Sequence, residues 1–343
     1  MERILITGPD FCAVTEDGTL TEYLKRDPKQ QYGNILGGTV ERMMPGIGCA
    51  FVDIGRKTSG FLPLQENSQS FEGESLKSGM RIPVQIRKEE TGKKGAFLTR
   101  DLTLAGRTVL LMPMNRYIGV SNRITDGDER ERMRTIGKEI AGGETGLVLR
   151  TAAQHAAPEE IAEEVRQLTA EWRQVQERIR NGYTDGEVLF RQDPLEQMIH
   201  DYESLGVRER RETESLNADL QRQLQEAEGR VIRIRNGGNI VIDRCEAMTV
   251  IDVNSASARG EGGPGTAYLE TNLASCETIA AQIRLRNLGG IIMIDFIDMK
   301  EDADRQKVAE KLAEMLARDR RKTVLHGWTH LGIMEMTRKR TGI

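Results

Sequence analysis

Two aspartates and an asparagine follow apolar stretches of the chain. Their carboxylate and amide oxygens could bind a cation. Asp252 comes directly after MTVI, and Asp295 comes directly after IIMI. Asn254 lies two residues beyond Asp252, which puts both side chains on the same face of an extended strand. A carboxylate in this position is costly to bury unless a positive partner neutralises it.

A strand, a helix and a second strand must position these residues. The sequence predicts a strand over 248–254, a helix over about 266–288 and a strand over 291–294. Strands joined through a helix pair in parallel, so Asp252 and Asp295 should lie at the carboxyl ends of neighbouring strands. Mg²⁺ between them would relieve their repulsion, and it can activate water and stabilise charge at phosphorus. The alternative is that the aspartates cap helices or accept hydrogen bonds from backbone amides.

Short alternating apolar runs separated by glycine-rich turns fill residues 33–99, which is typical of a small antiparallel barrel of the OB type. If residues 50, 52 and 54 point inward, Phe51 points outward. Phe61 lies nearby in sequence, and Lys94 stands at the last strand. Rings beside a cation bind single-stranded nucleic acid by base stacking and phosphate attraction. The alternative is that both rings cap the barrel core.

The next region, over 102–151, has two strand-like runs, 109–112 and 146–149, and the second ends on Arg150-Thr151. An arginine fork followed by a hydroxyl can hold a terminal phosphate, although such pairs are usually structural. Helices are predicted from Pro158 to the Asn-Gly pair at 181–182, near 194–202, and over about 208–228. All three are expected to serve packing without chemistry.

Composition bounds the class of protein. The 343 residues suggest two or more domains. With 49 basic against 53 acidic residues the molecule as a whole would not attract a polyanion, so a nucleic-acid site must be a local patch. The four cysteines lack metal-ligand spacing, which favours reduced thiols. There is no signal-peptide pattern and no apolar run of membrane-helix length. We therefore expect a cytoplasmic protein without a membrane span.

Several longer segments carry a resemblance to a known family. VIDVNSA and LETNLASCETIAAQIRLRNLGGIIMIDFIDM closely resemble the catalytic region of the bacterial ribonuclease E/G family, which comprises single-strand-specific endoribonucleases. GTVERMMPGIGCAFVDIGRKTSGFLPL is similar to that family's RNA-binding barrel, KEETGKKGAFLT to its closing strand, and GLVLRTAA to its 5′-end sensor. The resemblance thus extends over nearly the whole chain.

The resemblance implies an α+β multidomain fold. An OB-fold RNA-binding barrel (33–99) and a 5′-sensor region (100–185) would be inserted in a ribonuclease-H-like subdomain made of 1–32 and 186–228. A DNase-I-like α/β catalytic subdomain would follow over 229–343.

Site residues are implied position by position. Asp252 and Asp295 match the family's two metal-binding aspartates, and Asn254 matches the asparagine that orients the scissile phosphate or the water. The barrel residues that match RNA-gripping positions are Phe51, Phe61 and Lys94. The 5′-monophosphate would be clasped by Arg150 and Thr151, with the backbone of Leu110 facing it.

The chain departs from the family pattern in its sensor and at its end. Asn122 stands where an arginine is often found, which would weaken 5′-phosphate discrimination. The family's CPxC motif does not follow Arg340, so no zinc-linked tetramer is expected, whereas a homodimer remains compatible. His326 and His330 are spaced like a zinc pair but lack the glutamate of HExxH, which favours a packing or surface role.

The sequence therefore predicts an Mg²⁺-dependent endoribonuclease that cleaves single-stranded RNA to 5′-phosphate and 3′-hydroxyl ends, in RNA processing and mRNA decay. A preference for 5′-monophosphorylated RNA is implied by the family. The alternatives are a non-catalytic RNA-binding protein that uses the OB barrel and, less favoured, a nuclease acting on DNA. Intact Asp252, Asn254 and Asp295 argue against the first alternative.

Overall fold

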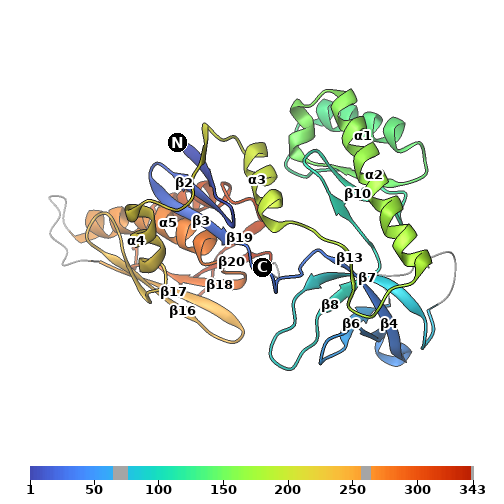
Figure 1. Cartoon of the computed structure of the whole chain (residues 1–343). Coiled ribbons are helices and arrows are strands. Elements are labelled where there is room, and N and C mark those ends of the chain that lie inside the picture. The colour runs from blue at the N-terminus through green and yellow to red at the C-terminus, as the bar shows by residue number, and fades with distance from the viewer. Residues whose placement is uncertain (65–75, 256–263, 341–343) are drawn as a thin grey trace. The chain divides into compact units, whose positions relative to one another are not determined.

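The computed structural model describes residues 1–64, 76–255 and 264–340, and the chain divides into two compact units (Figure 1). The terminal unit comprises Met1–Lys25 and Leu205–Thr341, and the inserted unit comprises Arg26–Ser204. The terminal unit is therefore built from both ends of the sequence. No described helix combines the length and apolar character that crossing a membrane requires.

The inserted unit contains a closed five-stranded barrel, which is consistent with the OB-like fold expected for 33–99. Its strands are β4 (Ile35–Met44), β5 (Cys49–Asp53), β6 (Gly60–Pro63), β7 (Arg81–Lys88) and β8 (Phe97–Thr99). They follow one another in the order β4-β5-β6-β8-β7, and β7 pairs back onto β4. The pairings are antiparallel except that of β6 with β8, which corrects the all-antiparallel expectation. A short 3-10 turn, Pro45–Ile47, connects β4 to β5, and β13 (Val188–Phe190) extends the sheet beside β4.

Alternate residues of the barrel strands fill its core, and on β7 the intervening Pro83 and Gln85 are buried as well. Ala50, Val52 and Ile54 are buried, as the sequence pattern predicts, and Ile82 and Ile86 meet them from β7. Because side chains of a strand alternate between its faces, the residues between these positions point outward.

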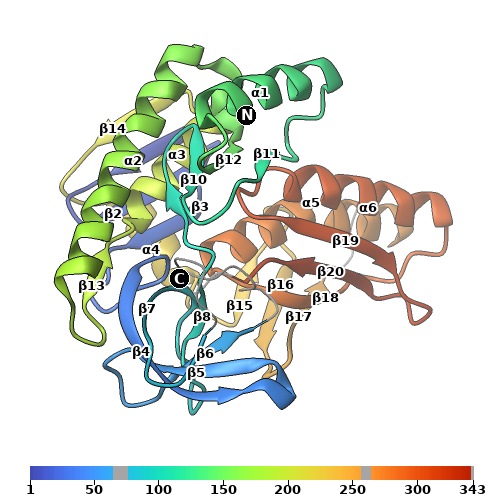
Figure 2. The ribbon, with the colours of Figure 1, turned by 90° about the vertical axis from the view of Figure 1, so that its right-hand side faces the viewer.

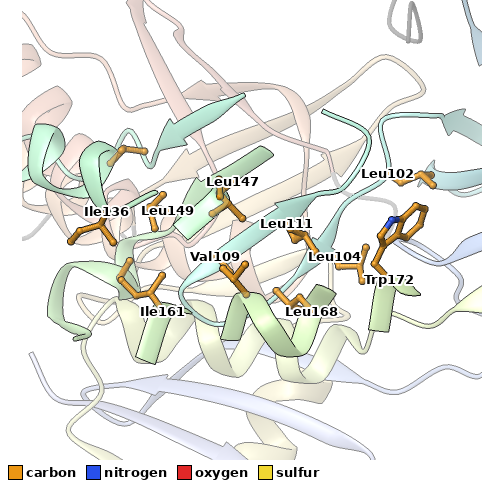
Figure 3. Close-up of a cluster of buried hydrophobic side chains, with 14 of the residues drawn as sticks. Leu102, Leu104, Val109, Leu111, Ile136, Leu147, Leu149, Ile161, Leu168 and Trp172 are labelled. Carbon is orange, nitrogen blue, oxygen red and sulfur yellow. The ribbon is translucent and has the colours of Figure 1, made fainter. Parts of the chain in front are cut away.

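A second core lies around a four-stranded sheet in the same unit (Figure 3). The sheet has the order β11-β12-β10-β9, and its strands are β9 (Leu104–Ala105), β10 (Val109–Met112), β11 (Ile118–Val120) and β12 (Gly146–Leu149). Helices α1 (Gly127–Ala141) and α2 (Pro158–Asn181) pack against it, with Leu168 and Trp172 of α2 buried. The 3-10 helix η3 (Thr151–His155) precedes α2, and α3 (Pro194–Ser204) follows β13. The predicted strands 109–112 and 146–149 and the helix starting at Pro158 are confirmed.

The terminal unit has two sheets that share α5 (Pro264–Leu285). One sheet has the order β14-β1-β2-β3, with β1 (Arg3–Thr7), β2 (Phe11–Glu16), β3 (Thr19–Lys25) and β14 (Glu209–Glu212). The other has the order β15-β16-β17-β18-β20-β19, and its elements are β15 (Val231–Arg233), β16 (Asn239–Arg244), β17 (Met248–Asn254), β18 (Gly290–Asp295), α6 (Asp302–Leu316), β19 (Thr323–Trp328) and β20 (Met334–Arg338). Helices α5 and α6 lie on the same side of this six-stranded sheet (Figure 2).

The helix predicted over about 208–228 is wrong in its first half. Glu209–Glu212 forms β14, which pairs in parallel with β1 at the edge of the first sheet. The helix α4 (Ala218–Glu226) begins only after Asn217, whose side chain caps the backbone N–H of Leu220 at 2.9 Å. Pairing with β1 provides backbone hydrogen bonds that outweigh the helical preference of the charged run.

A buried ion network joins the two sequence segments of the terminal unit. Glu16 of β2 accepts hydrogen bonds from Arg284 of α5 at 2.8 Å on each carboxylate oxygen, and from Arg3 of β1 at 2.8 and 3.1 Å. These three side chains are at most 5% exposed. Burial alone would raise the pKa of Glu16, but the hydrogen bonds and charges of Arg284 and Arg3 outweigh it and lower that pKa.

We expect Glu16→Gln to destabilise the fold by about 3–5 kcal/mol, because two buried guanidinium groups lose their counter-ion. Urea unfolding at pH 7 measures the effect. Asp219→Asn, which removes an exposed carboxylate paired with Arg222, is the matched control and should change stability little. Since the folded state lowers the pKa of Glu16 from its ordinary value of 4.5, its contribution is fully present at neutral pH. That contribution begins to fall below pH 4.5, and the stabilities of Glu16→Gln and the unchanged protein should converge only once the pH is below the lowered pKa. Equal unfolding midpoints for Glu16→Gln and Asp219→Asn would contradict the role of the network.

Candidate active site and nucleic-acid interface

The register of two parallel strands places the two predicted metal-binding aspartates opposite each other. Strand β17 pairs in parallel with β18, and Asp252 is the register partner of Asp295. Ile251, Val253 and Ile294 are buried against the helices, so alternation sends both aspartates to the opposite face. The strand-helix-strand crossover predicted from the sequence is thereby confirmed.

Both aspartates are exposed, so the cost of burying an unpaired carboxylate does not arise at these positions. They stand on the face of the sheet that α5 and α6 do not cover, so water solvates them. The side-chain amide of Asn254 donates a hydrogen bond to Asp252 Oδ2 at 2.8 Å. Asn254 thus lies on the same face as Asp252, as its spacing of two residues predicts.

Like charges meet at this edge of the sheet. Partial burial raises the pKa of Asp295, and the negative charges of Asp252 and Asp298 raise it further. The donors are carboxylate and amide oxygens, which are hard ligands of the kind that Mg²⁺ prefers, and Mg²⁺ is often held by only one or two carboxylates. Within 1–64, 76–255 and 264–340 no group of three or more His, Cys, Asp or Glu side chains is arranged to hold a metal. The donor set therefore fits an ion that leaves most of its positions to water and substrate.

A buried asparagine fixes the segment that follows Asp295. Asn272 of α5 donates to the carbonyl oxygen of Ile297 at 2.8 Å, and its side-chain oxygen accepts from the N–H of Ile297 at 3.0 Å. Asn272 is fully buried. This paired contact ties the chain between Asp295 and Asp298 to the helix beneath the sheet.

On the barrel, three aromatic rings form a row across neighbouring strands. Phe51 is the register partner of Phe61, with ring centroids 6.1 Å apart, and Phe61 is the partner of Phe97, 5.6 Å away. All three rings are half-buried and outside the barrel core. Cations stand at both ends of the row: Arg42 is the partner of Phe51, and Lys88 lies over the ring of Phe97 at 5.2 Å.

Lys94 lies in a tight turn before β8 and is exposed. Its backbone exchanges two 3.0 Å hydrogen bonds with Thr91. The expectation that Lys94 stands at the last strand is therefore shifted by three residues, since β8 begins at Phe97.

The residues expected to bind a 5′-phosphate lie together at the end of β12. Arg150 follows β12, and Leu110 of β10 pairs with Val148 on the same face. Thr151 Oγ1 lies 3.1 Å from Ser121 Oγ. The guanidinium of Arg150, however, forms an ion pair with Asp201 of α3 and donates to the carbonyl oxygen of Gly106. Asn122 is exposed in the turn beyond β11.

Comparison with known proteins identifies the family of this chain. The model of the "Ribonuclease E/G family" matches residues 103–210 and 207–341. The chain belongs to the ribonuclease E/G family. Ribonuclease G of Haemophilus influenzae is 34% identical over 96% of this chain and 77% of its own length, and ribonuclease G of Escherichia coli K12 is 32% identical over the same shares. Ribonuclease E of Nostoc sp. is 31% identical over 99% of this chain and 56% of its own length. The resemblance stated from the motifs is confirmed, and the protein is an enzyme of the ribonuclease E/G type.

Several residues at these sites escaped the sequence analysis of this ribonuclease E/G family member. Phe97 extends the aromatic row, and the alternation of Ala96, Phe97 and Leu98 carried the signal that Phe97 points outward. Asp201 could not be connected with Arg150, because 51 residues separate them and no local pattern links a helix to that strand. His326 hydrogen-bonds through Nε2 to Thr337 Oγ1 at 3.0 Å and is exposed.

Proposed function

We propose that the protein is an Mg²⁺-dependent endoribonuclease that cleaves single-stranded RNA to 5′-phosphate and 3′-hydroxyl ends, in RNA processing and mRNA decay. The observation that carries the proposal is the placement of Asp252 opposite Asp295, with Asn254 bonded to Asp252, on the open face of the sheet. Family membership supports RNA as the substrate. The closed barrel with its aromatic row supports a single strand rather than a duplex, because unstacked bases can lie on rings.

In the proposed reaction, side chains of the protein bind the cation and orient the reacting groups. Asp252 and Asp295 would bind the cation, which supplies stabilisation of charge at the phosphoryl oxygens and activation of water when bound. One amide N–H of Asn254 donates to Asp252. The second N–H would be available to donate to the scissile phosphate, and the side-chain oxygen to accept from the attacking water. Asn272 fixes the chain after Asp295 and so preserves the separation of the two carboxylates.

We expect Asp252→Asn and Asp295→Asn each to reduce RNA cleavage more than tenfold, or at least about 1.4 kcal/mol in activation free energy, because each removes a ligand charge. RNA affinity should stay within a few-fold, since the barrel provides most of the binding. The cleavage rate is measured with a labelled oligoribonucleotide in Mg²⁺, and the RNA affinity is measured by fluorescence anisotropy.

Asp243→Asn is the matched control, because Asp243 is a carboxylate of the same sheet paired with Arg230 instead of facing Asp295. Retention of more than a tenth of the turnover by either Asp252→Asn or Asp295→Asn would contradict the metal assignment. Binding without cleavage by the unchanged protein would support the alternative of a non-catalytic RNA-binding protein. Equal cleavage of a matched DNA oligomer would instead identify a general nuclease.

We infer that the aromatic row binds bases and that Lys94 binds a phosphate. Phe51→Ala and Phe61→Ala should each weaken RNA binding by about 1–3 kcal/mol with an unchanged salt dependence, because stacking releases no counter-ions. Lys94→Ala should instead lower the slope of log affinity against log salt by about 0.7. Tyr117→Ala removes an exposed ring elsewhere in the inserted unit and serves as control. Identical salt slopes for Phe51→Ala and Lys94→Ala would contradict the assignment of stacking to the ring and phosphate binding to the lysine. Unfolding of the phenylalanine variants would instead favour a role of the rings in capping the barrel core.

We further propose a modest preference for 5′-monophosphorylated RNA through Arg150, Thr151 and the backbone of Leu110. The preference is modest because Asp201 already neutralises Arg150, and Asn122 adds no cation. Arg150→Ala should equalise cleavage of 5′-monophosphate and 5′-hydroxyl oligomers, whereas Asp201→Asn should widen the few-fold difference. Arg107→Ala, which removes an exposed neighbouring arginine, is the control. Equal cleavage of 5′-monophosphate and 5′-hydroxyl oligomers by the unchanged protein would contradict the proposed 5′-phosphate site.

The homodimer stays a prediction, and measurement of the molecular mass in solution tests it.

A further inference from the structure

The face that carries the aspartates continues as a polar row onto the neighbouring hairpin. In register, Arg233 of β15 faces Asn239 of β16, and Asn239 faces Asn254 of β17. Val231, on the same side of β15 as Arg233, is 53% exposed, whereas Ile232 packs towards the helices. Arg233, Asn239 and Asn254 therefore share one face with Asp252.

The arginines of this hairpin differ in their partners. Arg230 holds both carboxylate oxygens of Asp243 at 2.5 and 2.6 Å, and Arg235 is ion-paired with Glu277 of α5. Arg233 is exposed and makes no side-chain hydrogen bond or ion pair with any residue in the described ranges. Its guanidinium is thus available to a ligand, whereas those of Arg230 and Arg235 are committed.

A phosphodiester approaching this face meets strong negative charge. Asp252, Asp295 and Asp298 are exposed together, and the field of Asp252 reaches the hairpin: the hydrogen bond and charge of Asp243 raise the pKa of Arg230, and the charge of Asp252 adds to that. A divalent cation balances two of these charges, and the flanking phosphates of the RNA need further cations. The backbones of β15 and β17 are two strand spacings, or about 10 Å, apart. Arg233 therefore stands about one to two nucleotides from the carboxylates.

We propose that Arg233 binds the phosphate of a nucleotide next to the scissile bond, with Asn239 beside it, and so positions the strand across the sheet. This inference rests on the proposed function. The planar fork of arginine suits two phosphate oxygens at once, which a lysine at the same position does not reproduce. Arg233 is a binding and positioning residue, and the aspartates remain the groups at the reacting atoms.

The test compares Arg233→Ala, Arg233→Lys and Arg235→Ala in the full chain. Binding of a single-stranded oligoribonucleotide is measured with a chelator present over a series of salt concentrations, and cleavage is measured in Mg²⁺. We expect Arg233→Ala to lower the salt slope by about 0.7 and to raise KM several-fold with a smaller change in kcat. Arg233→Lys should restore the slope but only part of the affinity. Arg235→Ala removes the same charge from the same hairpin and should match the unchanged protein.

A salt slope unchanged in Arg233→Ala, or lowered equally in Arg235→Ala, overturns the inference. The outcome is separable from that of the proposed function. If the unchanged protein does not cleave RNA but the slope depends on Arg233, the phosphate contact stands and the cleavage proposal fails. If cleavage occurs and Arg233→Ala behaves as the unchanged protein, the inference alone fails. Thermal unfolding of each variant shows that the comparison is made on folded protein.

Discussion

Two negative charges held opposite each other by a parallel strand pair are the constraint around which the terminal unit is built. Ladder hydrogen bonds between β17 and β18 fix the register that aligns Asp252 with Asp295, and the apolar residues between them secure it from the other face. A slip of one residue in either strand would turn that strand's carboxylate towards the core under α5. The buried apolar residues thus determine where the exposed carboxylates lie. Asn272 fixes the segment that follows β18 in the same way.

Local patterns in the sequence were sufficient wherever one residue's neighbours set its environment. The alternation around Val52 predicted which barrel residues are buried, and Pro158 marked the start of α2 correctly. Patterns failed where a distant partner decided the outcome. The run at 209–212 is charged and helix-compatible, but β1, some 200 residues away in sequence, recruits it as a strand. Arg150 suggested a free phosphate ligand because nothing near it in sequence reveals Asp201. The exposure of Asp252 could not be predicted, because alternation gives two faces without saying which one the helices cover.

The two candidate nucleic-acid surfaces are built on different physical terms. The barrel row of Phe51, Phe61 and Phe97 offers flat apolar area with cations at its margins, which favours bases of any identity. The open sheet face offers carboxylates, amides and the uncommitted Arg233, which favours the sugar-phosphate backbone. Stacking on the barrel would bind RNA of any sequence, whereas the charged groups of the sheet face would position one phosphodiester accurately. Each surface lies within one unit, so each can be altered without disturbing the core of the other.

The bond between Glu16 and Arg284 has a consequence for the order in which the chain acquires structure. These residues are 268 positions apart, so the first three strands are synthesised long before α5 exists to cover them. The inserted unit has its own cores and can fold while the ribosome is still translating the terminal unit. Strands β1–β3 must therefore remain without their final partner for most of translation, and docking of α5 closes a loop of 268 residues late. The amino-terminal strands are consequently the part of the nascent chain that most needs protection from aggregation.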